Sequence, residues 1–296
     1  MKRILTAALL GSLLQATPAK ACDVCGCGVS YYNPYLFPHL SKNYTSLSYF
    51  HRVYRTQNGE GGRSREDYNS LLLTLQYSVR KRFQVLALVP WQFNTLRNDA
   101  GSRSLSGLGD LSLLGQYRVW ERVSDKGVRQ VVLAGAGVKL ATGRYVPAAT
   151  SKTEDQNFQL GTGSTDLLFN GSYRISLRNW TFSAAGSYKY NTENEDGYRY
   201  GDVVNTSVQA TFRKEYRKWS LSPYVQLSQE WQLQDADRHV LQAASGGPVS
   251  YVAGGVEVNT RRFAFGANYQ AAAAQNLAGG LIRVEPRVAL RTSITF

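Results

Sequence analysis

Apolar and polar residues alternate along most of this chain, and the alternation runs to its last residue. Between residues 67 and 80, for example, Leu71 and Leu73 would face one side while Thr74 and Gln76 would face the other. A repeat of two residues is that of a β-strand, because successive side chains of a strand point to opposite faces of the sheet. Each such strand would therefore have one apolar and one polar face.

About twelve segments carry this alternation, and the connections between them are short and long in turn. The segments are 43–56, 67–80, 83–96, 107–120, 129–141, 164–177, 180–191, 202–216, 219–232, 247–260, 262–273 and 283–296. Tight turns such as Lys81-Arg82 alternate with polar loops, of which 142–163 is the longest. Short turns on one rim and long loops on the other are the organisation of a bacterial outer-membrane barrel. We therefore predict an all-β fold, a transmembrane antiparallel up-and-down β-barrel over residues 43–296, with short periplasmic turns and long extracellular loops.

A secreted soluble barrel or sandwich is the main alternative fold, because its strands also alternate. Soluble β-proteins have shorter strands on average, and they have no reason to keep Leu, Phe, Trp and Val so persistently on one outward face. A misread boundary would change the strand number to about ten or fourteen. After residue 21 we find no apolar run of the roughly 18 residues that a membrane-spanning helix requires.

The first residues have the features of a secretory signal. A basic start, Lys2-Arg3, precedes the apolar run Ile4–Leu14 and the small-residue cleavage pattern Ala19–Ala21. We predict a signal peptide at 1–21 and a mature chain that begins at Cys22. Acylation of that cysteine is the alternative, although alanine stands where a lipoprotein signal usually has leucine. With the barrel, this signal predicts the outer membrane of a Gram-negative bacterium.

The chain is strongly basic, with 34 lysines and arginines against 21 aspartates and glutamates and a formal net charge of +13. These cations are scattered singly among tyrosines, serines and glycines, without the basic helix or arm that is typical of nucleic-acid-binding proteins. We therefore expect no nucleic-acid partner, and instead a surface that meets anionic lipid headgroups or anionic solutes.

The last predicted strand has one apolar and one charged face. The apolar residues are Val284, Val288, Leu290, Ile294 and Phe296, and the charged residues are Arg283, Glu285, Arg287 and Arg291. A cation at the lipid midplane would cost roughly 2 to 4 kcal/mol. We therefore predict that the charged face lines the lumen.

Two further segments place an acid ahead of an arginine on one predicted face. The first contains Asp110, Gln116 and Arg118, and the second contains Asp166, Asn170 and Arg174. Glycines at 107 and 109 would permit a bend or bulge where the first segment enters the barrel. We predict that both rows line the lumen as a polar network, which either stabilises the barrel or contacts a solute.

The same two segments carry a family resemblance. GLGDLSLLGQYR, from Gly107 to Arg118, and GTGSTDLLFNGSY, from Gly161 to Tyr173, resemble the paired strand openings of the MetA-pathway of phenol degradation family, a relative of FadL-type outer-membrane transporters. The resemblance implies passive uptake of small organic, often hydrophobic or aromatic, molecules. It also implies that the terminal Phe296 is the signal read by the outer-membrane assembly machinery.

All three cysteines, Cys22, Cys25 and Cys27, lie in one short stretch ahead of the first predicted strand. In an oxidising periplasm a local disulfide that leaves one odd thiol is the default. Three thiolates could instead hold a soft metal such as Cu or Zn. The family resemblance does not decide between these alternatives, and we expect no other cofactor.

The segment 22–42, between the predicted signal and the barrel, is aromatic and contains Pro34 and Pro38, so we do not expect a strand there. In FadL-type barrels the N-terminal segment plugs the bore. By that resemblance the segment is a plug, and the alternative is a periplasmic tail.

We expect a channel or transporter, and not an enzyme. Nucleophilic hydrolysis requires a serine, a histidine and a group that orients the histidine, and the histidines at 39, 51 and 239 stand in no such pattern. The alternatives are a structural or adhesive barrel with a filled lumen, a metal-linked outer-membrane protein that uses the cysteines, and, less favoured, a membrane hydrolase. The expected partners are outer-membrane lipid, the assembly machinery and a small organic solute.

Overall fold

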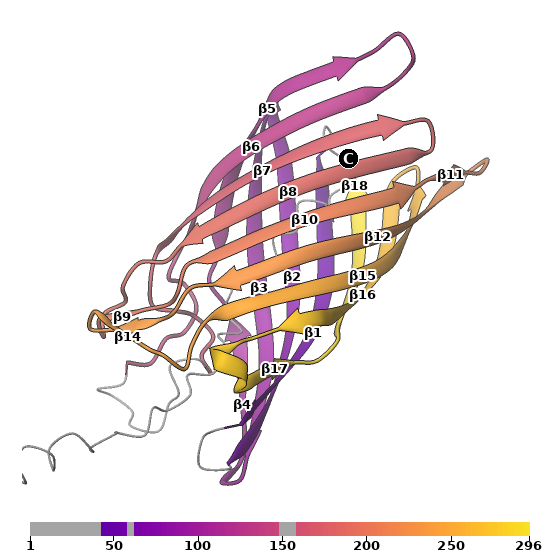
Figure 1. Cartoon of the computed structure of the whole chain (residues 1–296). Helices are drawn as coiled ribbons and strands as arrows, with labels where there is room; N and C mark the ends of the chain where they lie inside the picture. Colours follow the sequence, from indigo (N-terminus) through magenta and orange to yellow (C-terminus); the bar gives the residue numbers. More distant parts are fainter. Residues whose placement is uncertain (1–42, 58–61, 148–157) are drawn as a thin grey trace, which may run out of the picture.

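The computed structural model describes residues 43–57, 62–147 and 158–296. Twelve long antiparallel strands form its wall, each paired with its neighbours in sequence, and the pairing of the last with the first closes the sheet into a barrel (Figure 1). The strands are β1 (Tyr44–Gln57), β2 (Arg63–Arg80), β3 (Phe83–Asn98), β5 (Ser112–Val123), β6 (Arg129–Lys139), β7 (Asp166–Leu177), β8 (Trp180–Tyr190), β10 (Val203–Phe212), β12 (Trp219–Gln232), β15 (Gly247–Thr260), β16 (Phe263–Gln275) and β18 (Arg287–Thr295). The predicted all-β barrel and its strand number are confirmed. Closure leaves no sheet edge with unpaired backbone groups in the lipid.

Several shorter elements lie at the ends of these twelve strands. β4 (Gly101–Leu108) pairs with β3, β11 (Lys214–Glu215) with β12, and β17 (Ile282–Val284) with β1, while β9 (Tyr198–Arg199), β13 (Ala236–Asp237) and β14 (Val240–Leu241) form a separate sheet among the loops. A single 3-10 turn, η3 (Ala278–Gly280), is the helical element of the described chain. No helix in that part of the chain is long and apolar enough to cross a membrane.

The connections alternate in length as predicted, so the barrel has a short-turn end and a long-loop end. The first residues of β1 and the last residue of the chain lie together at the short-turn end, where the Phe296 N–H donates to the Asn43 carbonyl at 3.0 Å. In Figure 1 this end is at the top, and the sheet of β9, β13 and β14 lies at the opposite end. By the usual organisation of such barrels the short turns are periplasmic.

Two predicted boundaries differ from the structure near the long-loop end. The expected loop 97–106 is instead mostly strand, because β3 continues to Asn98 and turns back into β4, with Trp91 opposite Leu108 in register. The strand expected at 107–120 is broken between Leu108 and Ser112, and β5 begins only after that break. The polar composition of 101–108 predicted a loop. These residues form a strand because the extended β3 provides a partner with which they can pair.

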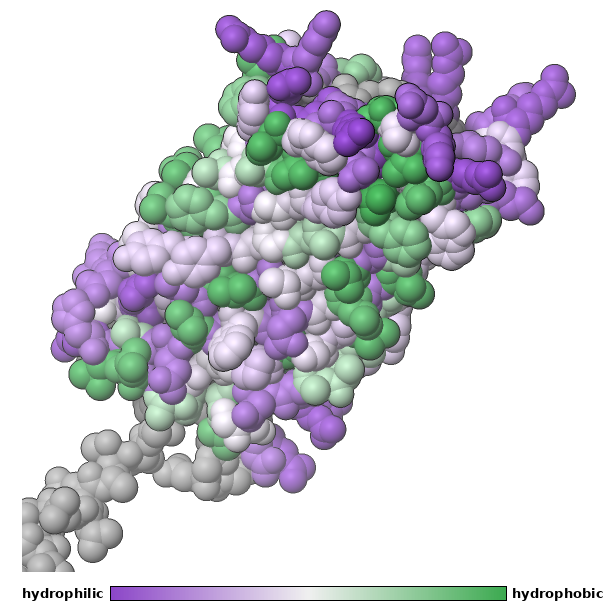
Figure 2. All heavy atoms as spheres, turned by 45° about the horizontal axis from the view of Figure 1, so that its top comes forward, coloured by the Kyte–Doolittle hydropathy of each residue, from purple (hydrophilic) through white to green (hydrophobic). Residues whose placement is uncertain are grey.

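The outer wall of the barrel is apolar. Large hydrophobic side chains that are exposed on it include Leu75, Leu113, Phe169, Val208, Val225, Leu227, Val252, Phe265 and Leu290. Figure 2 shows hydrophobic residues over the middle of the visible face and hydrophilic residues towards its ends. Three exposed tryptophans, Trp120, Trp180 and Trp219, lie at or near strand ends, as in the aromatic belt that meets the membrane interface. An exposed apolar surface of this extent requires lipid around it, which places the barrel in the outer membrane.

The closing strand is not continuous, and this corrects one prediction. β17 ends at Val284, and β18 begins at Arg287 beyond Glu285 and Pro286. Across this break the alternation shifts by one residue, so Val284 is buried whereas Arg283 is exposed. The prediction that Arg283 lines the lumen is therefore wrong, because a two-residue interruption at a proline exchanges the faces of the strand. Glu285 falls within the interruption, where it pairs with Arg55 at 2.5 Å.

Candidate functional site: the lumen of the barrel

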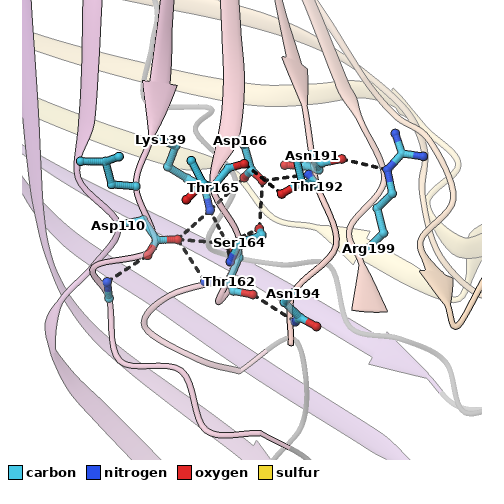
Figure 3. Close-up of polar contacts among 12 residues, drawn as sticks. Asp110, Lys139, Thr162, Ser164, Thr165, Asp166, Asn191, Thr192, Asn194 and Arg199 are labelled. Atoms are coloured by element: carbon cyan, nitrogen blue, oxygen red, sulfur yellow. Dashed lines mark hydrogen bonds and ion pairs between the residues drawn. The ribbon is translucent and has the colours of Figure 1, made fainter. Parts of the chain in front are cut away.

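A buried cluster of three charges lies where the lumen meets the long loops (Figure 3). The Lys139 ammonium, at the end of β6, is 2.7 Å from an Asp110 carboxylate oxygen and 2.8 Å from an Asp166 carboxylate oxygen. The side chains of Lys139 and Asp166 are fully buried, and that of Asp110 is nearly so. β6 and β7 are paired strands with Lys139 opposite Asp166, so pairing alone brings these two groups together.

The cluster pins both ends of the segment 140–165, which connects β6 to β7. The Gly143 N–H donates to one Asp110 oxygen at 2.9 Å, and the Thr162 N–H donates to the other at 3.0 Å. The Thr162 hydroxyl also contacts the Lys139 ammonium. Lys139 of β6 and the loop residues Gly143 and Thr162 therefore share one carboxylate, and these two loop residues cannot leave their positions without exposing a buried charge.

Asp166 extends the same network to the next loop. Its carboxylate accepts hydrogen bonds from the Ser164 hydroxyl at 2.9 Å and from the Thr192 N–H at 3.1 Å. The Asn194 amide donates to the Thr162 carbonyl at 3.1 Å. As Figure 3 shows, the two neighbouring loops are thus joined around the acid cluster.

Beyond the charged cluster, the segment 140–165 carries an apolar side chain into the barrel. Phe158 is fully buried, and its ring lies 6.2 Å from that of Tyr68 on β2. The following Leu160 carbonyl accepts a hydrogen bond from the Gln92 amide of β3 at 2.9 Å. The buried apolar cluster around this ring comprises Tyr54, Tyr68, Leu96, Phe158, Val249, Tyr251, Leu277, Ala278, Ile282 and Val284. Loop and wall residues therefore fill the long-loop half of the lumen over the described chain.

Two arginines of β18 lie inside the barrel and pair with acids of other strands. Arg287 is 3.2 Å from a Glu230 carboxylate oxygen and donates to the Tyr54 hydroxyl at 2.9 Å. Its guanidinium also lies over the Tyr251 ring, 4.4 Å from the ring centre. Further towards the short turns, Arg291 pairs with Glu257 of β15.

The short-turn half of the lumen contains a cavity of about 340 Å³. Its polar lining residues are Ser48, Arg129, Arg174, Ser176, Thr181, Ser183, Gln209, Thr211, Arg213, Ser222, Tyr224, Glu257, Asn259, Asn268 and Arg291. Phe50 and Val131 add apolar surface. The lumen thus has an occluded long-loop half and a hydrophilic vestibule in its other half.

The predicted rows are found on the inner face, but their partners are not those that we expected. Gln116 accepts from the Gln84 amide at 2.7 Å and donates to Asn170 at 3.0 Å. Arg118 pairs with Glu121 at 2.7 Å. Neither aspartate pairs with the arginine of its own strand, because Arg118 and Arg174 lie towards the short-turn end, whereas both acids meet Lys139.

Reasoning from the sequence missed Lys139. Its position was foreseeable, since it follows Val131, Leu133, Gly135 and Gly137 on the inner face of β6. The predicted metal ligands Cys22, Cys25 and Cys27 and the predicted plug lie outside the described residues. Within those residues, no group of three or more His, Cys, Asp or Glu side chains could hold a metal ion.

Comparison with known proteins agrees with this architecture. The COG4313 outer membrane channel from Pseudomonas putida F1 is similar in structure, with a TM-score of 0.65, 16% identity, and coverage of 86% of this chain and 96% of that chain. The β domain of the Bordetella autotransporter BrkA has a TM-score of 0.55 and 12% identity over 86% of this chain and 100% of that chain. These identities establish the shared fold. No match was found among curated proteins.

A match between the sequence and a family model shows which family the chain belongs to. A family model described as "Putative MetA-pathway of phenol degradation" matches residues 58–281, which include every strand from β2 to β16. The match covers the segments around Gly107 and Gly161 that carry the resemblance in the sequence. The chain therefore belongs to the MetA-pathway of phenol degradation family of outer-membrane barrels.

Proposed function

We propose that this barrel is a channel for the passive uptake of small organic solutes, and that residues 140–147 and 158–165 of the β6–β7 connection form its constriction. The observation that carries the proposal is the division of the lumen into an occluded half and a vestibule of about 340 Å³. A volume in this range is typical of pockets that take small molecules. A barrel with a purely structural role has no need of such a space.

The family description supports an aromatic or phenolic solute, and the similar protein from Pseudomonas putida F1 is named a channel. A small aromatic molecule fits a vestibule of this size. Enzymatic activity is not part of the proposal. His51 contacts Asn69 at 2.8 Å, and His239 contacts Glu193 in an exposed pair at 3.2 Å, so neither histidine is placed against a serine nucleophile.

The constriction is tested by Phe158→Ala in planar bilayers. Removing a fully buried ring from the occluded half should raise the single-channel conductance above that of the wild type. The matched control is Phe265→Ala, which removes the same side chain from the lipid-facing wall and should leave the conductance unchanged.

The absence of any conductance would contradict the proposed channel. If neither the wild type nor Phe158→Ala conducts ions or admits solutes to liposomes, the barrel is not a channel. A separate prediction concerns the N-terminal segment 22–42, which would plug the bore. Deletion of residues 23–42 should raise the conductance if that segment enters the bore, and an unchanged conductance would rule it out.

A further inference from the structure

The vestibule in the short-turn half of the lumen is lined by four arginines and one glutamate, Arg129, Arg174, Arg213, Arg291 and Glu257. We infer that it is a binding site for a small organic anion, and specifically for a carboxylate on a flat or aromatic body. This inference rests on the proposed channel and names the class of solute that the channel would select.

Strand pairing gathers three of these guanidinium groups on one wall. Arg129 of β6 lies opposite Ser176 of β7, and Arg174 precedes that serine by two residues on the same inner face. Residues in this diagonal relation are about 7–8 Å apart, within reach of long side chains. Arg213 follows directly after β10, whose Thr211 pairs with Thr181 of β8. The three cations, from β6, from β7 and from the residue that follows β10, therefore line one space.

The acids around this wall do not balance its cations. Arg118 and Arg129 share one carboxylate, that of Glu121, at 2.7 Å each. Arg213 pairs with Glu215 in a solvent-exposed pair, which screening by water weakens. Glu257, the acid in the lining, is already paired with Arg291. With four arginines against one glutamate, the lining carries a net positive charge that attracts a bound anion.

The remaining lining matches the rest of such a solute. Hydroxyl and amide groups such as those of Ser183, Gln209 and Asn268 can solvate a carboxylate, and Phe50 and Val131 offer an apolar side to a ring. Guanidinium is the side chain that best matches a carboxylate, because its planar donors bind both oxygens at once. A neutral hydrocarbon offers no charge to complement this positive lining.

The short-turn rim around the mouth of the vestibule is positively charged, as is the vestibule lining. Exposed basic residues of the short-turn rim include Arg80, Lys81, Arg82, Arg122, Lys126, Arg178, Lys214, Arg217, Lys218, Arg261 and Arg262. The acids of the same turns are Glu121, Asp125 and Glu215. Figure 2 shows hydrophilic side chains gathered at this end. A mouth with one dominant sign of charge raises the local concentration of the opposite ion.

The test compares benzoate with benzamide, which has nearly the same shape but no charge. Binding to the full-length mature protein in detergent is measured by calorimetry at low salt. Benzoate should bind and benzamide should not, and Arg174→Gln should weaken benzoate binding about tenfold or more, because a hydrogen-bonded ion pair to the ligand is lost. Arg213→Gln should act in the same direction.

The matched control is Arg63→Gln, which removes the same charge from an exposed position at the long-loop end and should not change benzoate binding. Heat-modifiable gel mobility confirms that each variant is folded. Equal affinity for benzamide and benzoate, or full benzoate binding by Arg174→Gln, would overturn the inference.

Conductance separates this inference from the proposed function. Benzoate binding that depends on Arg174, in a barrel that never conducts, would uphold the anion site and refute the channel. A conducting barrel that shows no preference for chloride over potassium in a salt gradient, and no benzoate binding, would uphold the channel and refute the anion site.

Discussion

Lys139 is the residue on which the loop architecture depends most. Its ammonium is fully buried between two carboxylates, and both carboxylates also hold backbone N–H groups of loops. Taking an ammonium out of water is costly, and its attraction to nearby acids offsets that cost only while the pairing is intact. The cluster therefore specifies where Gly143 and Thr162, near the two ends of the β6–β7 connection, lie more than it adds net stability.

Replacing Lys139 with methionine should destabilise the barrel by about 3–5 kcal/mol, because it leaves Asp110 and Asp166 buried beside each other without a cation. Urea unfolding of the refolded protein in detergent, followed by tryptophan fluorescence, measures the change. The control is Lys126→Met in an exposed periplasmic turn, for which a change of less than about 0.5 kcal/mol is expected. Equal midpoints for the two variants would show that the cluster does not hold the loops.

Gly161 is a second residue with a definite steric role. A Cβ atom there would lie 2.6 Å from the Gly143 carbonyl oxygen and 2.7 Å from an Asp110 oxygen. Gly161→Ala should therefore push the two ends of the segment 140–165 apart and raise the conductance. Gly171→Ala is the control, because its nearest neighbour would be 3.9 Å away. A conductance that is unchanged in Gly161→Ala would mean that this close approach does not maintain the constriction.

At the scale of single residues, the sequence predicted which face of a strand a side chain occupies, but it did not predict which residues that side chain contacts. Alternation was enough to place Asp166 and Arg287 on the inner side of their strands and Asp110 on the inner side of the barrel. It could not show that one lysine serves two aspartates, since that depends on the stagger of neighbouring strands and on a loop that folds back into the barrel.

At the scale of elements, the last strand combines a predicted and an unexpected part. Phe296 is exposed and continues the outward row of Leu290 and Ile294, as alternation predicts. The interruption at Glu285 and Pro286 was not expected, although proline is rarely tolerated in the middle of a paired strand. Its effect is to turn Val284 into the apolar cluster that fills the long-loop half.

Phe296→Asp should impair assembly into the outer membrane, because it removes the terminal outward aromatic side chain and places a charge at the membrane interface. The amount of heat-modifiable barrel in isolated outer membranes measures the effect. Thr295→Asp, which introduces the same charge on the inner face of the neighbouring position, is expected to assemble. Normal assembly of Phe296→Asp would refute the assigned role of the terminal residue.

At the scale of the whole molecule, the wall separates lipid from lumen residue by residue. Val208 is exposed on the outer wall, and the next residue, Gln209, lines the vestibule. Val208→Arg should destabilise the barrel in lipid by about 2–4 kcal/mol, whereas Gln209→Arg should be tolerated and should strengthen anion binding. Unfolding in phospholipid vesicles distinguishes the two. Similar losses of stability would show that the faces are assigned wrongly.

The sequence by itself determined the class of fold, the number of strands, the end that carries the short turns and the inner face of nearly every strand. These properties are local, because the two-residue repeat and the turn residues can be read within one strand or hairpin. The tertiary structure alone decided that Lys139 joins Asp110 to Asp166, that Phe158 lies within the barrel and that the vestibule is lined by arginines. Those features arise from closure and stagger, which bring together residues that are distant in the chain, and no local pattern records them.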